Sequence, residues 1–247
     1  TILGIVNKNK GYYLTALDHY LKALNAAETI QDDGRISACY NNIGNIHLLL
    51  EDYEKACGYF NKSLKIEEKF NRPLQKSIRL YNLGDAYNRR DSFDLALSYF
   101  TNSLLIEKKL ANTEGVVYAQ LGIADIYIKI DRLADAERLL EQINQVLEKY
   151  QIEERILYEI LLGRIHMARE NYAESLRSFD RAETASIQNN FRIHLLDIYL
   201  LKIETFKALK DWKSSTDVYD QFEELKDELN QEKIKSQLED KTFQNEL

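Results

Sequence analysis

The sequence contains very little proline and glycine. Its 247 residues include one proline and nine glycines. Folds rich in β-structure need many tight turns, which these two residues dominate, so their scarcity argues against a sandwich or a barrel. Hydrophobic residues still make up 45% of the chain, which is enough to bury a core and is not typical of a disordered protein. The composition therefore predicts an all-α protein.

Cysteine and histidine are also scarce, with two and four copies. Cys39 and Cys57 fall on the two helices of one predicted hairpin, each beside a predicted core residue, and no histidine flanks them at the spacing of a zinc site. We expect two small buried thiols, no metal site and no bound cofactor. Two unpaired cysteines suit a reducing compartment, so we expect a cytoplasmic location.

The sequence lacks the marks of several functional classes. It has no Gly-rich phosphate loop, no H-E-x-x-H and no G-x-S-x-G, so we expect no enzymatic activity. No stretch approaches the roughly 20 apolar residues of a membrane span, and no signal peptide is visible. The net charge is −7, the pI is about 5.3, and no basic cluster exceeds Arg89–Arg90, which argues against nucleic-acid binding.

One pattern recurs along the whole chain: a small residue followed four positions later by a bulky one. The pairs are Ala16/Tyr20, Ala56/Phe60, Ala96/Phe100, Ala136/Leu140, Ser175/Phe179 and Ser215/Tyr219. Successive small residues are 40, 40, 40, 39 and 40 positions apart. Such regularity predicts an array of identical modules, in which each module buries the open face of its neighbour. Arrays of this kind bind other molecules more often than they catalyse reactions.

The best-formed module spans residues 80–107. Leu80, Leu83, Gly84 and Tyr87 fall at i, i+3, i+4 and i+7, which is one face of a helix. Asp91-Ser92 interrupts this pattern and can cap the next helix. A second apolar stripe follows at Phe93, Ala96, Leu97, Phe100 and Leu104.

This module resembles the tetratricopeptide repeat, whose pattern is L-G-x-x-Y followed by A-x-x-x-F and a proline. Leu83-Gly84, Tyr87, Ala96 and Phe100 carry the resemblance best. It implies a right-handed α-solenoid of about six helical hairpins plus an extended C-terminal helix. The array would cover residues 1–222, with units at about 1–35, 36–73, 74–113, 114–151, 152–190 and 191–222. A repeat of 40 residues, longer than the common 34, resembles kinesin light chains, leucine-glycine-asparagine G-protein regulators and bacterial peptide-pheromone receptors.

Residues 223–247 form a charged segment without glycine or proline, and we predict a single helix there. It is either a cap with a solvated end or a coiled-coil lead into a further domain. In the second case a homodimer through this helix is possible.

The resemblance also implies a binding surface, because the first helices of successive hairpins line the concave groove of this family. The candidate partner-binding residues are Asn41, Asn45, Leu48, Tyr81, Asn82, Asp85, Asn88, Arg89, Tyr118 and Asp125. Amide side chains donate and accept hydrogen bonds, which suits a peptide backbone, and tyrosine supplies a large, rigid contact area.

The same resemblance argues against one subclass. Family members that bind chaperone tails hold a terminal carboxylate with two asparagines and several basic residues. Asn45 and Asn82 match the amides, but Asn41, Tyr118 and Gly122 replace the cations. We therefore expect no chaperone-tail binding.

Two classes of function remain open. The first is a non-catalytic scaffold that binds a protein or peptide segment in its groove. The alternative is a sensor or dimerisation segment of a bacterial signalling protein, such as a histidine kinase, nucleotide cyclase or transcription regulator, whose output domain lies elsewhere. A pheromone receptor would require a further domain upstream of Thr1, and because the chain begins inside a repeat we expect its natural N-terminus to lie upstream.

Overall fold

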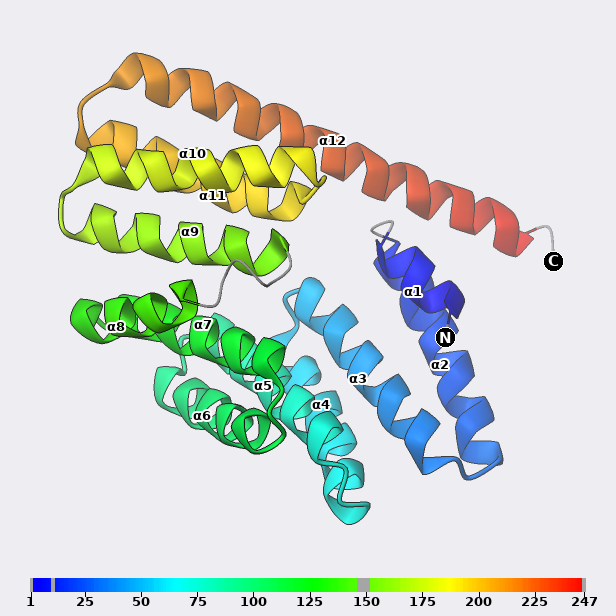
Figure 1. Ribbon diagram of the computed structural model, residues 1–247. Helices are drawn as coiled ribbons and strands as arrows, with labels where there is room; N and C mark the ends of the chain where they lie inside the picture. The colour runs from blue at the N-terminus through cyan, green and yellow to red at the C-terminus, as the bar shows by residue number, and fades with distance from the viewer. Residues whose placement is uncertain (1, 10–11, 146–151, 246–247) are drawn as a thin grey trace. The chain divides into compact units, whose positions relative to one another are not determined.

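The computed structural model describes the backbone of residues 2–9, 12–145 and 152–245, and side chains as far as residue 230. Every regular element in these ranges is an α-helix (Figure 1). The helices are α1 (Ile2–Asn9), α2 (Tyr13–Thr29), α3 (Asp33–Leu49), α4 (Tyr53–Lys69), α5 (Pro73–Arg89), α6 (Phe93–Lys109), α7 (Thr113–Lys129), α8 (Leu133–Asn144), α9 (Ile152–Ala168), α10 (Tyr172–Gln188), α11 (Arg192–Ala208) and α12 (Trp212–Asn245). None of these helices is both long and apolar enough to cross a membrane.

The chain divides into two compact units. The first unit comprises residues 1–119 together with 231–247, and the second comprises residues 120–230, so the division falls inside α7. In the first unit each helix from α1 to α6 packs against the next, and α3 also contacts α5. In the second unit α8 to α11 pack consecutively in the same way, and α9 contacts α11. The prediction of an all-α protein built from consecutive helical hairpins is confirmed.

Nine of the connections between helices are short turns that lie wholly within the described residues and contain no glycine. One residue in each of nine turns has a positive φ of 50–60°; these residues are Gln31, Glu51, Asn71, Asp91, Ala111, Asp131, Glu170, Asn190 and Lys210. After α2, for example, Gln31 N–H donates to the Glu28 carbonyl and Asp32 N–H donates to the Ala27 carbonyl. These bonds satisfy the last carbonyls of the helix and turn the chain into the next one. The turns therefore recur without the glycine that a left-handed residue usually requires.

Glycine serves instead where two helices of a hairpin approach closely. A Cβ added at Gly44, Gly84 or Gly163 would lie 2.4–2.7 Å from the ring of the phenylalanine on the paired helix. These rings, from Phe60, Phe100 and Phe179, are at most 1% exposed. In the fourth hairpin Ala124 replaces the glycine and the smaller Leu140 replaces the ring, and both remain buried. The repeat thus conserves the combined volume of the two positions.

The last hairpin departs from this rule. Tyr219, the sixth bulky residue of the pattern, is 48% exposed. Ile203 stands at the position that is glycine in four other hairpins (Gly4, Gly44, Gly84 and Gly163), so the tyrosine ring has no space beside α11. Val218 takes its place and packs with Leu195 and Ile203.

Helix α12 has 34 residues, against 17 in most of the others. Phe222 and Leu225 pack on α11, and Glu228 forms an ion pair with Arg192 at 2.6 Å. The helix is continuous across the predicted boundary at residues 222 and 223, and that boundary stays a prediction. The expected buried thiols are confirmed, since Cys39 and Cys57 are free and at most 5% exposed.

Candidate functional site

The predicted groove residues of the first unit lie on α3, α5 and the first half of α7. Leu74 and Ile78 of α5, which the sequence analysis did not select, extend this surface. We call the whole surface the amide face, and it consists of Asn41, Asn45, Leu74, Ile78, Tyr81, Asn82, Asp85, Arg89 and Tyr118. On α5 its members follow a helical spacing from Leu74 to Arg89, which places them along one stripe. Buried residues of the same helix, such as Leu80 and Leu83, occupy the other side, so the stripe faces away from the core.

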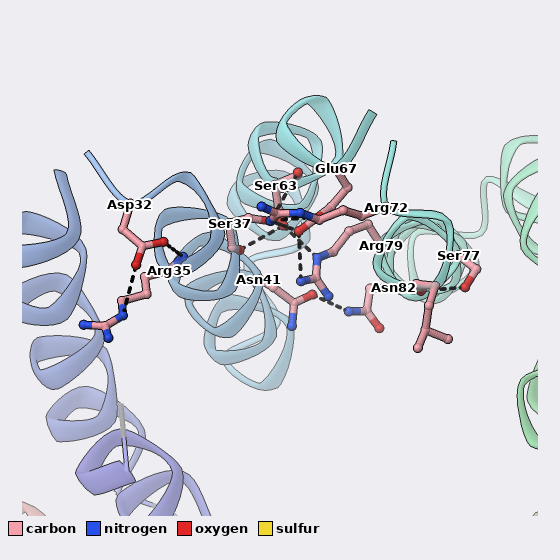
Figure 2. Close-up of polar contacts among 11 residues, drawn as sticks. Asp32, Arg35, Ser37, Asn41, Ser63, Glu67, Arg72, Ser77, Arg79 and Asn82 are labelled. Atoms are coloured by element: carbon pink, nitrogen blue, oxygen red, sulfur yellow. Dashed lines mark hydrogen bonds and ion pairs between the residues drawn. The ribbon is translucent and has the colours of Figure 1, made fainter. Parts of the chain in front are cut away.

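An amide pair lies at the centre of this face. Asn82 Nδ2 on α5 donates to Asn41 Oδ1 on α3 at 2.7 Å, and both side chains are half-buried (Figure 2). Each asparagine carries two donors and one acceptor oxygen, so one shared bond leaves N–H groups on Asn41 and an acceptor on Asn82. The pair thus bridges two hairpins and still offers both kinds of hydrogen bond. Asn45, one turn further along α3, is half-buried and forms no side-chain hydrogen bond within the described ranges.

Two tyrosines extend the face toward α7. The Tyr81 ring lies 5.2 Å from that of Phe100, which belongs to the core, and 6.1 Å from that of Tyr118 at an interplanar angle of 71°. Edge-to-face packing of this kind fixes the ring orientations. Both tyrosines are half-buried and Tyr81 packs on the core, so their rings form a rigid aromatic surface.

The charged members of the face compensate each other. Arg89 Nε contacts the Asp85 carboxylate oxygens at 3.1 and 3.3 Å, one helical turn apart on α5.

Three predicted residues lie elsewhere. Leu48 packs on the core cluster that contains Phe60 and Leu80. Asn88 is only 6% exposed, so its side chain is part of the helix packing. Asp125 belongs to the second unit, where it pairs with Arg164 of α9 and, at 3.1 Å, with Lys129. At the positions around it, Leu121, Ile160 and Leu161 are buried.

Next to the amide pair lies a buried polar junction that joins α3, α4 and α5 (Figure 2). Arg79 Nε donates to Ser63 Oγ at 2.7 Å, and its guanidinium lies 3.6 Å from the Glu67 carboxylate. The Ser37 hydroxyl donates to the same carboxylate. The side chains of Glu67 and Arg79 are 2% and 8% exposed. Burial lowers the pKa of Arg79, and the charge of Glu67 opposes that change.

The junction supports the amide face because it shares the same helices. Arg79 and Asn82 lie three residues apart on α5, and Ser37 and Asn41 lie four apart on α3, so each pair projects from one side of its helix. A buried ion pair is stable only when further hydrogen bonds satisfy both partners. Ser37 and Ser63 supply such bonds to Glu67 Oε1 and to Arg79. Within the described residues Glu67 Oε2 accepts no hydrogen bond, and it lies 3.7 Å from the Arg72 guanidinium.

A second version of this junction, which lacks the arginine, occurs one repeat later. Ser77 contacts Glu107, and Asn112 Nδ2 donates to the other carboxylate oxygen at 2.8 Å. Ala119 stands where Arg79 stands in the first version. A Cβ at Gly115 would lie 2.4 Å from the carboxyl carbon of Glu107, so this glycine makes room for the carboxylate.

Sequence reasoning missed both junctions, although a signal was present. Ser37 and Glu67 are 30 residues apart, and the same pair recurs as Ser77 and Glu107. Polar residues that repeat in register with apolar ones indicate buried partners between hairpins.

The comparison with family models decides the classification. The model described as tetratricopeptide repeat matches residues 2–69 and 77–149, which is more than half of the chain. The chain belongs to the tetratricopeptide repeat family. No curated protein matches it significantly.

Solved structures of the same fold are similar at low identity. A Rap protein complexed with Competence and Sporulation Factor has a TM-score of 0.70 and 14% identity, over 93% of this chain and 74% of that one. Aspartyl phosphate phosphatase F from Bacillus subtilis has a TM-score of 0.73 and 15% identity, over 91% of this chain and 58% of that one. NprR in complex with its cognate peptide NprX has a TM-score of 0.69 and 14% identity, over 90% of this chain and 67% of that one. At such identities the likeness shows a shared tetratricopeptide fold alone.

Proposed function

We propose that this chain is a non-catalytic tetratricopeptide scaffold whose amide face binds a peptide segment of a protein partner. The Asn41–Asn82 pair carries the proposal, because it places amide donors and an acceptor together on a surface that two hairpins hold rigidly. A peptide group needs one donor and one acceptor from its receptor, and the pair can supply both. The solved NprR structure, which contains a peptide, is consistent with this use of the fold.

The amide face also has suitable contact surface. Leu74 and Ile78 are each 41% exposed on the same stripe as Tyr81, so apolar side chains of a ligand would lose water on binding. The rings of Tyr81 and Tyr118 are held by packing, which reduces the entropy lost when a partner binds.

The test is a selection of phage-displayed random peptides on the immobilised protein, followed by calorimetry with a synthetic copy of a selected peptide. Asn82→Ala removes one half of the amide pair and should weaken binding by about 10-fold, since a ligand hydrogen bond in a partly buried site contributes about 1–1.5 kcal/mol. Asn102→Ala is the matched control, because Asn102 is an exposed amide on the outer helix α6. Equal affinities for wild type and Asn82→Ala would place the binding site elsewhere.

A second candidate is a sensor or dimerisation segment of a bacterial signalling protein. The observation that favours it is the length of α12, which exceeds what is needed to cover α11. Light scattering at several concentrations tests the dimer that this role requires. A monomer at all concentrations would count against dimerisation through this helix.

A further inference from the structure

The amide face differs from a site for charged ligands in the way its charges are arranged. Asp85 and Arg89 compensate each other on α5, and the nearby Lys76 bonds to Glu68 at 2.8 Å. The cations of the buried polar junction, Arg79 and Arg72, lie against Glu67. On α7 the exposed carboxylate of Glu114 lies one turn before Tyr118. Within the described part of this face, every cation has a carboxylate beside it.

The uncharged groups of the face are arranged in two adjoining patches. Leu74, Ile78 and the edge of Tyr81 form an apolar patch along the first three turns of α5. Asn41, Asn82 and Asn45 form an amide patch beside it. A ligand that covers both patches places apolar side chains on the first and its peptide groups on the second.

Ligands with a negative charge are disfavoured on this surface. A carboxylate that leaves water needs a cation or several charged donors to compensate it. The amides are neutral donors, and the exposed carboxylate of Glu114 would repel a second carboxylate at short range. The chain's net charge of −7 adds to this repulsion at low salt.

We propose, resting on the function proposed above, that the amide face selects an internal peptide segment with apolar side chains, and not an acidic segment or a free carboxyl terminus. The peptide groups of such a segment bond to the asparagines, and its side chains cover Leu74, Ile78 and Tyr81. Because no net charge is exchanged, binding depends little on ionic strength.

The experiment compares three forms of one selected peptide by fluorescence polarisation: capped at both ends, ending in a free carboxylate within the bound segment, and carrying one aspartate there. The capped form should bind most tightly, and the free carboxylate and the aspartate should each weaken it at least 10-fold. For the capped form, the Kd should change by less than about 3-fold between roughly 0.1 M and 1 M salt, over which the Debye length falls from about 10 Å to about 3 Å.

A variant supplies the missing cation. Asn45→Lys should restore binding of the aspartate form, whereas the matched Asn102→Lys on the outer helix α6 should not. Tighter binding of the free carboxylate or aspartate form by the wild type would overturn the inference, as would a strong salt dependence of the capped form. Either result would leave the proposed peptide-binding function intact, provided that Asn82→Ala weakens the interaction. Selection of no peptide, or no effect of Asn82→Ala, would refute the proposed function itself.

Discussion

The close approach of α5 and α6 gives the sharpest test of how the repeat is packed. An added Cβ at Gly84 would lie 2.7 Å from Cδ1 and 2.8 Å from Cε1 of Phe100, a fully buried ring. The substitution Gly84→Ala therefore forces the ring or the helix to move. Forcing an extra methyl group into a packed core costs about 1–3 kcal/mol. Alanine recovers about 0.5–1 kcal/mol of helix propensity, so we expect a net loss of about 0.5–2 kcal/mol.

A second substitution should relieve this clash. Phe100→Leu removes three carbons and by itself costs roughly 2 kcal/mol at about 0.8 kcal/mol per buried carbon. It also makes room for the methyl group, as the natural pair Ala124 and Leu140 shows in the fourth hairpin. The double variant should therefore be about 1 kcal/mol more stable than the sum of the single effects predicts.

The assay is urea denaturation followed by far-UV circular dichroism, with amide hydrogen exchange of α5 and α6 as a local readout. The local readout is needed because repeat arrays can unfold in parts. Gly58→Ala is the control, since a Cβ on this residue of α4 would meet nothing within 4 Å and should stabilise the protein by about 0.5–1 kcal/mol. If Gly84→Ala stabilises the protein as much as Gly58→Ala does, the reasoning about close approach is wrong.

Three further predictions concern buried polar groups. Arg79→Met leaves Glu67 buried without its α5 partner and should lower the free energy of unfolding by about 3 kcal/mol. The double variant with Glu67→Met should recover most of this loss, and a double-mutant cycle in urea measures the coupling of the two residues. Glu154 is fully buried, and neither of its carboxylate oxygens has a hydrogen-bond partner in the described part of the chain. Glu154→Leu should therefore raise the free energy of unfolding by about 1–3 kcal/mol. A loss of stability would contradict this prediction. Burial lowers the pKa of His47 below 6.5, although the charge of Asp52 opposes this shift. Below pH 6.5 the unfolded state therefore binds more protons than the folded state, so stability falls as the pH drops through 6.5. His47→Tyr, which imitates the stacked Tyr87, should remove this part of the pH dependence of the melting temperature, and an unchanged pH profile would show that His47 does not cause it.

The candidate site could be predicted from the sequence only in part. The register of the repeat placed Asn41, Tyr81 and Asn82 on one surface, because a helical period fixes which residues share a face. It could not show that Asn88 is buried and that Leu48 packs into the core. Both depend on how the neighbouring helix approaches, which the period of a single helix does not contain.

The sequence by itself determined the number and kind of modules. Small and bulky residues four apart, repeated every 40 positions, leave each helix pair with an apolar face that only another pair can cover. This is local information, because the spacing within each copy is enough to predict helices and hairpins. The exposure of Tyr219 could also have been predicted from the sequence, since Ile203 stands at a repeat position that is glycine in other hairpins.

Only the tertiary structure decided which polar residues meet. Glu67 and Arg79 come from different hairpins, and so do Asn41 and Asn82, which are 41 positions apart. Whether such side chains bond depends on the distance and rotation between packed helices, to within about an ångström, since hydrogen bonds weaken steeply beyond their short range. The apolar pattern tolerates larger shifts, so it specifies the array without specifying these contacts.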